Sequence, residues 1–171
     1  AVRCGAAFRV GDPKPFVSEC VPVELKLYVP ADARIEDWGI PEFERDGLTA
    51  WRFEPNRTRS HVVLNGRAFS GIAYPSTLTP NRAGRVAIGP ARLRLVLIQL
   101  TLDAFGPSPA EFPLWLDVPA VPLAARPLPP GAPEGFSNAV GSFTVTATAE
   151  TAEVREADPV VVNLDVAGTG N

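Results

Sequence analysis

His61 is the single histidine of the chain, and it limits how much catalysis the sequence can offer. A Ser-His-Asp triad or a Cys-His pair would have to use this one imidazole. His61 falls inside a run with strand character, where an ordinary sheet histidine is the simpler interpretation. One histidine and two cysteines also cannot close a structural zinc site without carboxylates. We therefore expect no enzyme activity, no catalytic residue, no metal and no cofactor.

Carboxylates gather in one segment, residues 30–47, which reads PADARIEDWGIPEFERDG. Glu36, Asp37, Glu42, Glu44 and Asp46 form the cluster within it. Their spacing lacks the D-x-D-x-D-G form of a calcium loop, so a solvated acidic loop is the first interpretation. In the second, Trp38, Glu42, Phe43 and Glu44 bind a partner, since aromatic anchors beside charges are typical of interaction hot spots. The first interpretation is favoured, with Trp38 and Phe43 only holding the loop against the rest of the protein.

Cys4 and Cys20 are the only cysteines. A disulfide between them would close a loop of about 15 residues, which the chain-entropy model values at roughly 3 kcal/mol. Two free thiols are the other interpretation, one near the terminus and one at the start of a strand. The sequence leaves both open, because it does not show whether the two residues approach each other.

Composition and charge exclude two classes of partner. The formal net charge is −3 and the arginines are scattered, which gives no electrostatic reason to expect nucleic acid. The densest apolar run, residues 93–102, contains Arg94, Gln99 and Thr101, so it cannot span a membrane. We expect any membrane attachment to use a helix outside residues 1–171. The length and a hydrophobic fraction of 46% predict one domain, or one domain plus a fragment.

Alternation with a period of two dominates the chain and predicts strands. Val21, Val23, Leu25, Leu27 and Val29 would share one face of a half-buried strand. Further strands are expected at residues 48–53, 61–64, 67–76, 86–88, 91–102, 112–118 and 142–150. Seven to nine short strands between turn signals predict an all-β fold, specifically an immunoglobulin-like β-sandwich.

Several local features refine this prediction. Asn65-Gly66 between two strand-like runs predicts a type I′ hairpin, because both turn positions need positive φ. Within residues 91–102 the apolar residues change from odd-numbered to even-numbered positions, which predicts a β-bulge or a strand buried on both faces. Gly89-Pro90 is expected to separate that strand from the one before it. Residues 30–47 are expected to form a long loop, with a short helical turn as an option. Trp51 and Trp115 fall in strand-like runs and are expected in the core.

The chain repeats one element. The segment 157–171 repeats the pattern of residues 19–29 after a shift of 137 positions, which puts Leu27 on Leu164 and Val29 on Val166. We expect a β-sandwich over residues 1–126, a proline-rich joint at 127–141, and the first strands of a second, truncated β-sandwich repeat at 142–171.

Three stretches of the chain resemble the bacterial aerotolerance protein family BatD. They are RVGDPKPFVSECVPVELKLYVP, STLTPNRAGRVAIGPARLRL, and RPLPPGAPEGFSNAVGSFTVTATAETAEVREADPVVVNLDVAGTGN. In that family a proline-rich joint leads to a phenylalanine, an Ala-Val-Gly turn and a strand. Phe136, Ala139-Val140-Gly141, Asp158-Pro159 and Gly168–Asn171 match that order. Residues 31–60 carry no recognisable likeness, and neither cysteine belongs to the family pattern.

The resemblance implies a bacterial protein anchored in the cytoplasmic membrane. Its tandem immunoglobulin-like domains would lie on the periplasmic or extracytoplasmic side, after a signal peptide and before a transmembrane helix. Family members are encoded beside proteins with von Willebrand factor A domains, which carry a metal-dependent adhesion site. The implied function is a non-enzymatic interaction or scaffold module for such envelope proteins, linked to oxygen or stress tolerance. The acidic segment would then offer a carboxylate that completes the partner's metal site.

A carbohydrate-binding or adhesive β-sandwich is the alternative function. Such a module needs exposed, coplanar aromatic side chains, and the chain has only 3 tryptophans and 2 tyrosines. The expected burial of Trp51 and Trp115 therefore argues against it.

Overall fold

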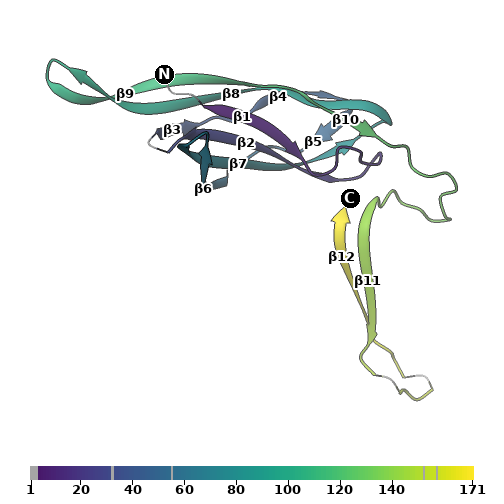
Figure 1. Cartoon of the computed structure of the whole chain (residues 1–171). Helices are drawn as coiled ribbons and strands as arrows, with labels where there is room; N and C mark the ends of the chain where they lie inside the picture. Colours follow the sequence, from purple (N-terminus) through teal and green to yellow (C-terminus); the bar gives the residue numbers. More distant parts are fainter. Residues whose placement is uncertain (1–3, 32, 55, 152, 157) are drawn as a thin grey trace.

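Antiparallel β-strands make up the whole fold (Figure 1). The computed structural model describes residues 4–31, 33–54, 56–151, 153–156 and 158–171, and these ranges contain no helix. Two five-stranded sheets lie against each other, and a separate two-stranded hairpin stands apart from them. The prediction of an all-β protein is confirmed.

The first sheet follows the order β1-β2-β7-β5, with β6 also paired to β7. The bounds are β1 Gly5–Val10, β2 Val21–Pro30, β5 Leu48–Ala50, β6 Asn56–Leu64 and β7 Arg67–Pro80. The alternation predicted for residues 21–29 is confirmed, because all five odd-numbered side chains are buried and the even-numbered ones face outward. Asn65 and Gly66 form the turn that connects β6 to β7, with φ angles of 50° and 74°, as the Asn-Gly signal predicts.

The second sheet is organised around one long strand. The bounds are β3 Arg34–Trp38, β4 Glu42–Asp46, β8 Gly84–Asp103, β9 Gly106–Val118 and β10 Val121–Ala125, and each of the other four pairs with β8. The predicted separation at Gly89-Pro90 is wrong, since β8 continues through it. Strand β10 pairs with the start of β8, and β9 pairs with the rest of it.

One core lies between the two sheets and draws side chains from both. Its largest fully buried members are Tyr74, Phe53, Leu25, Leu27, Ile72, Leu78, Ile88, Leu93 and Leu95. Face-to-face packing of two sheets, each with an inward apolar row, is the arrangement of a β-sandwich. The period-two pattern of the sequence therefore positions most of this core.

The change of apolar residues from odd to even positions within residues 91–102 does not come from a β-bulge opposite β9. Pairing between β8 and β9 runs without interruption from Ala91–Val118 to Asp103–Gly106. Leu95, Val96 and Leu97 are all buried, so the alternative of a strand covered on both faces holds there. A register shift lies instead in the partner strand β3, which contributes an extra residue between Ile35 and Asp37.

The long loop predicted for residues 30–47 is wrong, because β3 and β4 occupy most of it. Both strands add to the edge of β8, and Ile35 of β3 is buried, as are Ala33 and Pro41, which directly precede β3 and β4. The carboxylates occupy exposed positions along these strands. Short edge strands with charges on the outer side give a weak periodic signal, which is why the sequence reads as a loop.

The prediction that Trp51 and Trp115 serve the core is also wrong. Trp51 follows β5 and is 72% exposed, while Trp115 on β9 is 51% exposed. Trp115 pairs with the exposed Arg94 and so faces outward from the second sheet, where the guanidinium of Arg92 stacks 5.3 Å from its ring centroid. Alternation places both tryptophans at outward positions, and the aromatic residue type alone is misleading.

The third element is the hairpin of β11 Gly141–Ala149 and β12 Val162–Gly170, which pair only with each other among the described strands. Residues 127–140 connect it to the sandwich without forming a strand of their own. Figure 1 shows the hairpin projecting from one end of the sandwich, while the β8–β9 turn projects at the other end.

Tyr74 of β7 supplies a testable feature of the core. Its side chain is fully buried, and its hydroxyl has no hydrogen-bond partner in the described part of the chain. Burial, followed by the nearby charge of Asp37, raises the pKa of Tyr74 to about 12. Because the folded pKa exceeds the unfolded value near 10, the ionisation of this group does not affect stability below about pH 10. Stability falls as the pH rises from there toward 12, because only the unfolded state readily loses the proton.

We predict that Tyr74→Phe raises the free energy of unfolding at pH 7 by about 1 kcal/mol, because it removes an unsatisfied buried hydroxyl. The variant should also lose less stability than the wild type between pH 10 and pH 12. Urea unfolding at both pH values measures this, with Tyr28→Phe, on the outer face of β2, as the control. A Tyr74→Phe protein less stable than the wild type at pH 7 would contradict the prediction.

Candidate functional site

The joint after β10 is fixed to the loop between β1 and β2. The amide of Ala124 donates to the carbonyl of Pro13 (3.0 Å) and that of Arg126 to Pro15 (2.7 Å). The amide of Val17 donates back to Arg126 (2.9 Å), so the two segments run side by side as a short parallel bridge. Beyond Arg126 the frequent prolines cannot donate to a ladder, and the chain continues in an extended form.

The base of the hairpin closes against the other end of the joint. The amide of Val140 donates to Oδ1 of Asn171 (2.7 Å), and the amide of Asn171 approaches the carbonyl of Val140 at 3.4 Å. Val140 is buried, in contrast to the strand residues that follow it. The joint is therefore anchored at both ends by backbone contacts.

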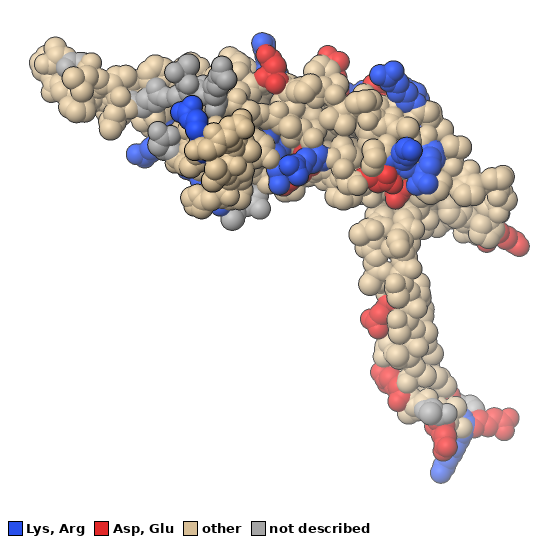
Figure 2. Space-filling model, in the orientation of Figure 1, with Lys and Arg blue, Asp and Glu red and all other residues tan. Residues whose placement is uncertain are grey.

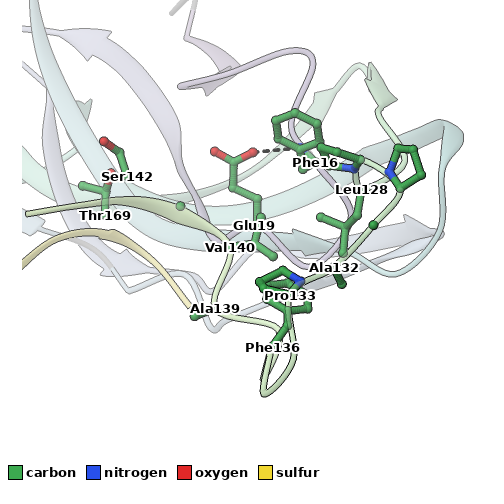
Figure 3. Close-up of a pocket in the computed structure, with 14 residues that line it drawn as sticks. Phe16, Glu19, Leu128, Ala132, Pro133, Phe136, Ala139, Val140, Ser142 and Thr169 are labelled. Atoms are coloured by element: carbon green, nitrogen blue, oxygen red, sulfur yellow. Dashed lines mark hydrogen bonds between the residues drawn. The ribbon is translucent and has the colours of Figure 1, made fainter.

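A cavity of about 470 Å³ lies between the loop, the joint and the hairpin base (Figure 3). Its apolar walls include Phe16, Leu128, Pro133, Phe136 and Val140. Ser142 and Thr169 lie at the hairpin side of the cavity in Figure 3, and Glu19 lies between the two sides. Cavities of this size and composition are typical of ligand sites. We call this cavity the joint pocket.

Glu19 is the ionisable residue that lines the joint pocket. Its Oε2 accepts a hydrogen bond from the Phe16 amide at 2.7 Å, and the other carboxylate oxygen points away from Phe16 in Figure 3. The guanidinium of Arg126 lies 3.9 Å from the Phe16 ring centroid, with one of its nitrogens 3.8 Å from a carboxylate oxygen of Asp12. The cation that stacks on Phe16 is thus paired with another acid, and Glu19 is the charged side chain among the lining residues.

The hairpin exposes an apolar face. Cross-strand pairs place Val145 beside Val166 and Ala147 beside Leu164. The opposite face carries Thr144, Thr146, Thr148, Asn163, Asp165 and Thr169. Figure 2 shows few charged side chains along the hairpin shaft and a group of them at its far end. No described segment covers the apolar face, because every residue of both strands except Gly170 is exposed.

The four residues predicted to bind a partner have two different environments. Trp38 and Phe43 pack against the core. The guanidinium of Arg59 lies 5.5 Å from the Trp38 ring centroid, and that of Arg45 lies 4.9 Å from the Phe43 ring centroid. Their packing agrees with the interpretation that they hold this segment against the sandwich. Glu42 and Glu44 are exposed and line a shallow depression with Arg92 and Asp117. The two carboxylates therefore remain accessible to a partner, on a strand that Phe43 anchors.

Cys4 and Cys20 are free thiols at opposite ends of the β1–β2 pair. Gly5, next to Cys4, pairs with Tyr28, which is eight positions beyond Cys20. At about 3.3 Å per residue the two cysteines lie roughly 26 Å apart, far beyond disulfide distance. The fold therefore accommodates the interpretation of two free thiols and not the bridge. Burial raises the pKa of the Cys4 thiol.

The remaining chemistry is sparse over the described ranges. His61 is an exposed residue of β6. No three side chains of His, Cys, Asp or Glu in the described chain come together as metal ligands. Within the same ranges, no helix is long and apolar enough to cross a membrane. Trp51 follows β5 of the first sheet and Trp115 lies on β9 of the second, so they do not form one flat aromatic platform for a sugar.

Sequence reasoning missed the joint pocket. It recognised residues 126–135 as a stiff connector but did not pair them with Phe16 and Glu19, more than 100 positions earlier. The available signal was the unusual density of prolines followed by Phe136, which predicts a rigid apolar wall. Comparison of the chain with protein-family models, with curated proteins and with solved structures finds no match.

Proposed function

We propose that the chain is a non-enzymatic interaction and scaffold module of a membrane-anchored bacterial envelope protein of the BatD kind, linked to oxygen or stress tolerance. Its partners are von Willebrand factor A-domain proteins on the periplasmic side. In this proposal residues 1–126 are an immunoglobulin-like sandwich and 127–141 are the joint. Residues 142–171 begin a second repeat. The observation that supports this most is the bare apolar face of the β11–β12 hairpin.

The repeated element has opposite environments in its two copies. Leu25, Leu27 and Val29 of β2 are 0% exposed. Their counterparts after the shift of 137 positions are Val162, Leu164 and Val166 of β12, which are 54%, 68% and 66% exposed. An isolated two-stranded hairpin is marginal in water and needs a third strand or a packed face. The same sequence pattern, covered in one copy and bare in the other, supports a modular protein built from stacked units.

The size of the face indicates what covers it. Nine residues at about 3.3 Å and two strands at about 4.8 Å give a face of roughly 30 Å by 10 Å. Two such faces would bury roughly 600 Å² in total, about half of what a specific interface needs. Pairing between the hairpins of two copies would therefore be weak. A complete second sheet fits the face better, and we assign that sheet to the second repeat.

Partner binding is assigned to the accessible carboxylates of β4. The Phe43 ring packs edge-on against Phe53, with ring centroids 5.1 Å apart, and this contact fixes the strand that carries Glu42 and Glu44. A rigid strand reduces the entropy lost on binding. A carboxylate oxygen is also the type of ligand that Mg²⁺ accepts when its coordination sphere is open.

We predict that Glu42→Gln/Glu44→Gln lowers the affinity for a purified von Willebrand A-domain protein from the same envelope by tenfold or more. Calorimetry in Mg²⁺, and again with a chelator, measures the affinity and its metal dependence. Glu36→Gln, an exposed carboxylate on β3, is the matched control and should bind within about twofold of the wild type. The proposal fails if the wild type binds no such protein, or if the double variant binds as tightly as the wild type.

A further inference from the structure

The joint pocket has the walls of a site for an apolar side chain. Phe16 and Phe136 provide aromatic surface, while Leu128, Pro133 and Val140 provide aliphatic surface. Its volume of about 470 Å³ is within the range of small-ligand sites and exceeds what one amino-acid side chain fills. A segment of two or three residues therefore matches the space better than a single small group.

The carboxylate of Glu19 determines which type of residue is favoured next to that apolar side chain. Glu19 provides a carboxylate, and its bond to the Phe16 amide occupies Oε2 only. Arg126, the closest described cation to the Phe16 ring, is already paired with Asp12. A carboxylate beside apolar walls favours an ammonium or guanidinium, because hydrogen bonds between charged groups are stronger than neutral ones.

The pocket is preorganised on the sandwich side. Three backbone hydrogen bonds tie residues 13–17 to residues 124–126, and they hold Phe16 and the start of the joint in place. The turn from Phe16 to Glu19 is closed twice, by the Glu19 amide on the Phe16 carbonyl (3.2 Å) and by the carboxylate on the Phe16 amide. Proline restricts the backbone of the opposite wall. A rigid site loses less entropy when it binds a flexible segment.

We infer that the joint pocket binds a peptide segment in which a large apolar residue is followed by lysine or arginine. The apolar side chain lies between Phe16, Leu128 and Phe136, and the cation pairs with Glu19. This inference rests on the proposed function as an interaction module, since it assigns a partner chemistry to the joint. It concerns a surface separate from Glu42 and Glu44, so either can fail without the other.

The test uses the full chain and three peptides, acetyl-Phe-Lys-amide, acetyl-Phe-Glu-amide and acetyl-Ala-Lys-amide. Amide chemical shifts of Gly131, Gly141 and Thr169, which line the pocket, are followed by NMR during titration. We expect saturable shifts with the first peptide and affinities lower by about tenfold or more with the other two. No A-domain protein is present, so the result does not depend on the β4 proposal.

Glu19→Gln is the decisive variant, because its amide oxygen can still accept from the Phe16 amide while the charge is lost. It should weaken acetyl-Phe-Lys-amide about tenfold and bring it level with the acidic peptide. Glu134→Gln, in the same joint but outside the lining, should change nothing. Phe136→Ser should weaken both phenylalanine peptides while leaving the amide spectrum of β2 unchanged. Equal binding of the lysine and glutamate peptides, or an unaltered affinity in Glu19→Gln, would overturn the inference.

Discussion

Phe53→Ala is expected to lower the free energy of unfolding by about 3–5 kcal/mol, the usual cost of removing a buried aromatic ring. Phe53 follows β5 and is fully buried. Its ring lies 5.8 Å from that of Phe8 on β1 and 5.1 Å from that of Phe43 on β4, as measured between centroids. It therefore joins the two sheets through one aromatic cluster, and the alanine would leave a cavity that neither sheet can close alone.

Urea unfolding followed by tryptophan fluorescence measures this change. Leu102→Ala is the control, because the Leu102 side chain is 87% exposed near the β8–β9 turn and its loss should cost within about 0.5 kcal/mol. If the proposed binding to an A-domain protein holds, the Phe53 variant should also bind it more weakly, since Phe43 loses the ring against which it packs. A change in stability below about 1 kcal/mol would show that Phe53 does not hold the sheets together.

The central strands of the sandwich are predictable from the sequence because their pattern is long and regular. Five consecutive odd positions of β2 are apolar, and a shift of one residue would expose all of them. The β6–β7 turn is predictable for a different reason, since Asn65-Gly66 specifies a conformation that few residue pairs adopt easily. In both places the local sequence pattern matches the environment that the segment has in the fold.

Edge strands and outward aromatics are not predictable in the same way. Each of β3 and β4 offers only five residues, mostly charged, and both exist because β8 provides a free edge for them. Trp115 looks like a core residue by type, yet its position opposite Arg94 places it outside. These features depend on which strand lies next to which, and a single sequence does not contain that information in its local pattern.

The two candidate sites also differ in how far the sequence could predict them. The exposed carboxylates of β4 could be identified from composition, whereas the joint pocket combines residues far apart in the sequence. The hairpin gives the clearest case, because β2 and β12 share one alternation and yet only β2 is covered. Periodicity therefore predicts which face of a strand is suited to burial, while the neighbouring sheet determines whether it is buried.

The β3–β4 edge can be tested at Gly39, where the chain passes close to the backbone of β8. The Gly39 amide donates to the carbonyl of Arg94 at 3.1 Å. A Cβ at this position would lie 2.1 Å from the same carbonyl oxygen and 3.1 Å from its carbon. These are backbone atoms in the middle of a paired strand, so they cannot move aside as the end of a flexible side chain can.

Gly39→Ala is therefore expected to lower the free energy of unfolding by about 3 kcal/mol, at the upper end of the range for overpacking. Because Trp38 and Glu42 lie on the two strands that Gly39 connects, the variant should also weaken A-domain binding about as much as loss of the β4 carboxylates does. Gly5→Ala on β1 is the control, since its added Cβ meets no atom within 4 Å, and its stability should stay within about 0.5 kcal/mol of the wild type. Thermal and urea unfolding, with the binding assay in parallel, measure both effects. If Gly39→Ala is as stable as the wild type, the β3–β4 edge does not lie this close to β8, and the rigid placement of Glu42 and Glu44 loses its basis.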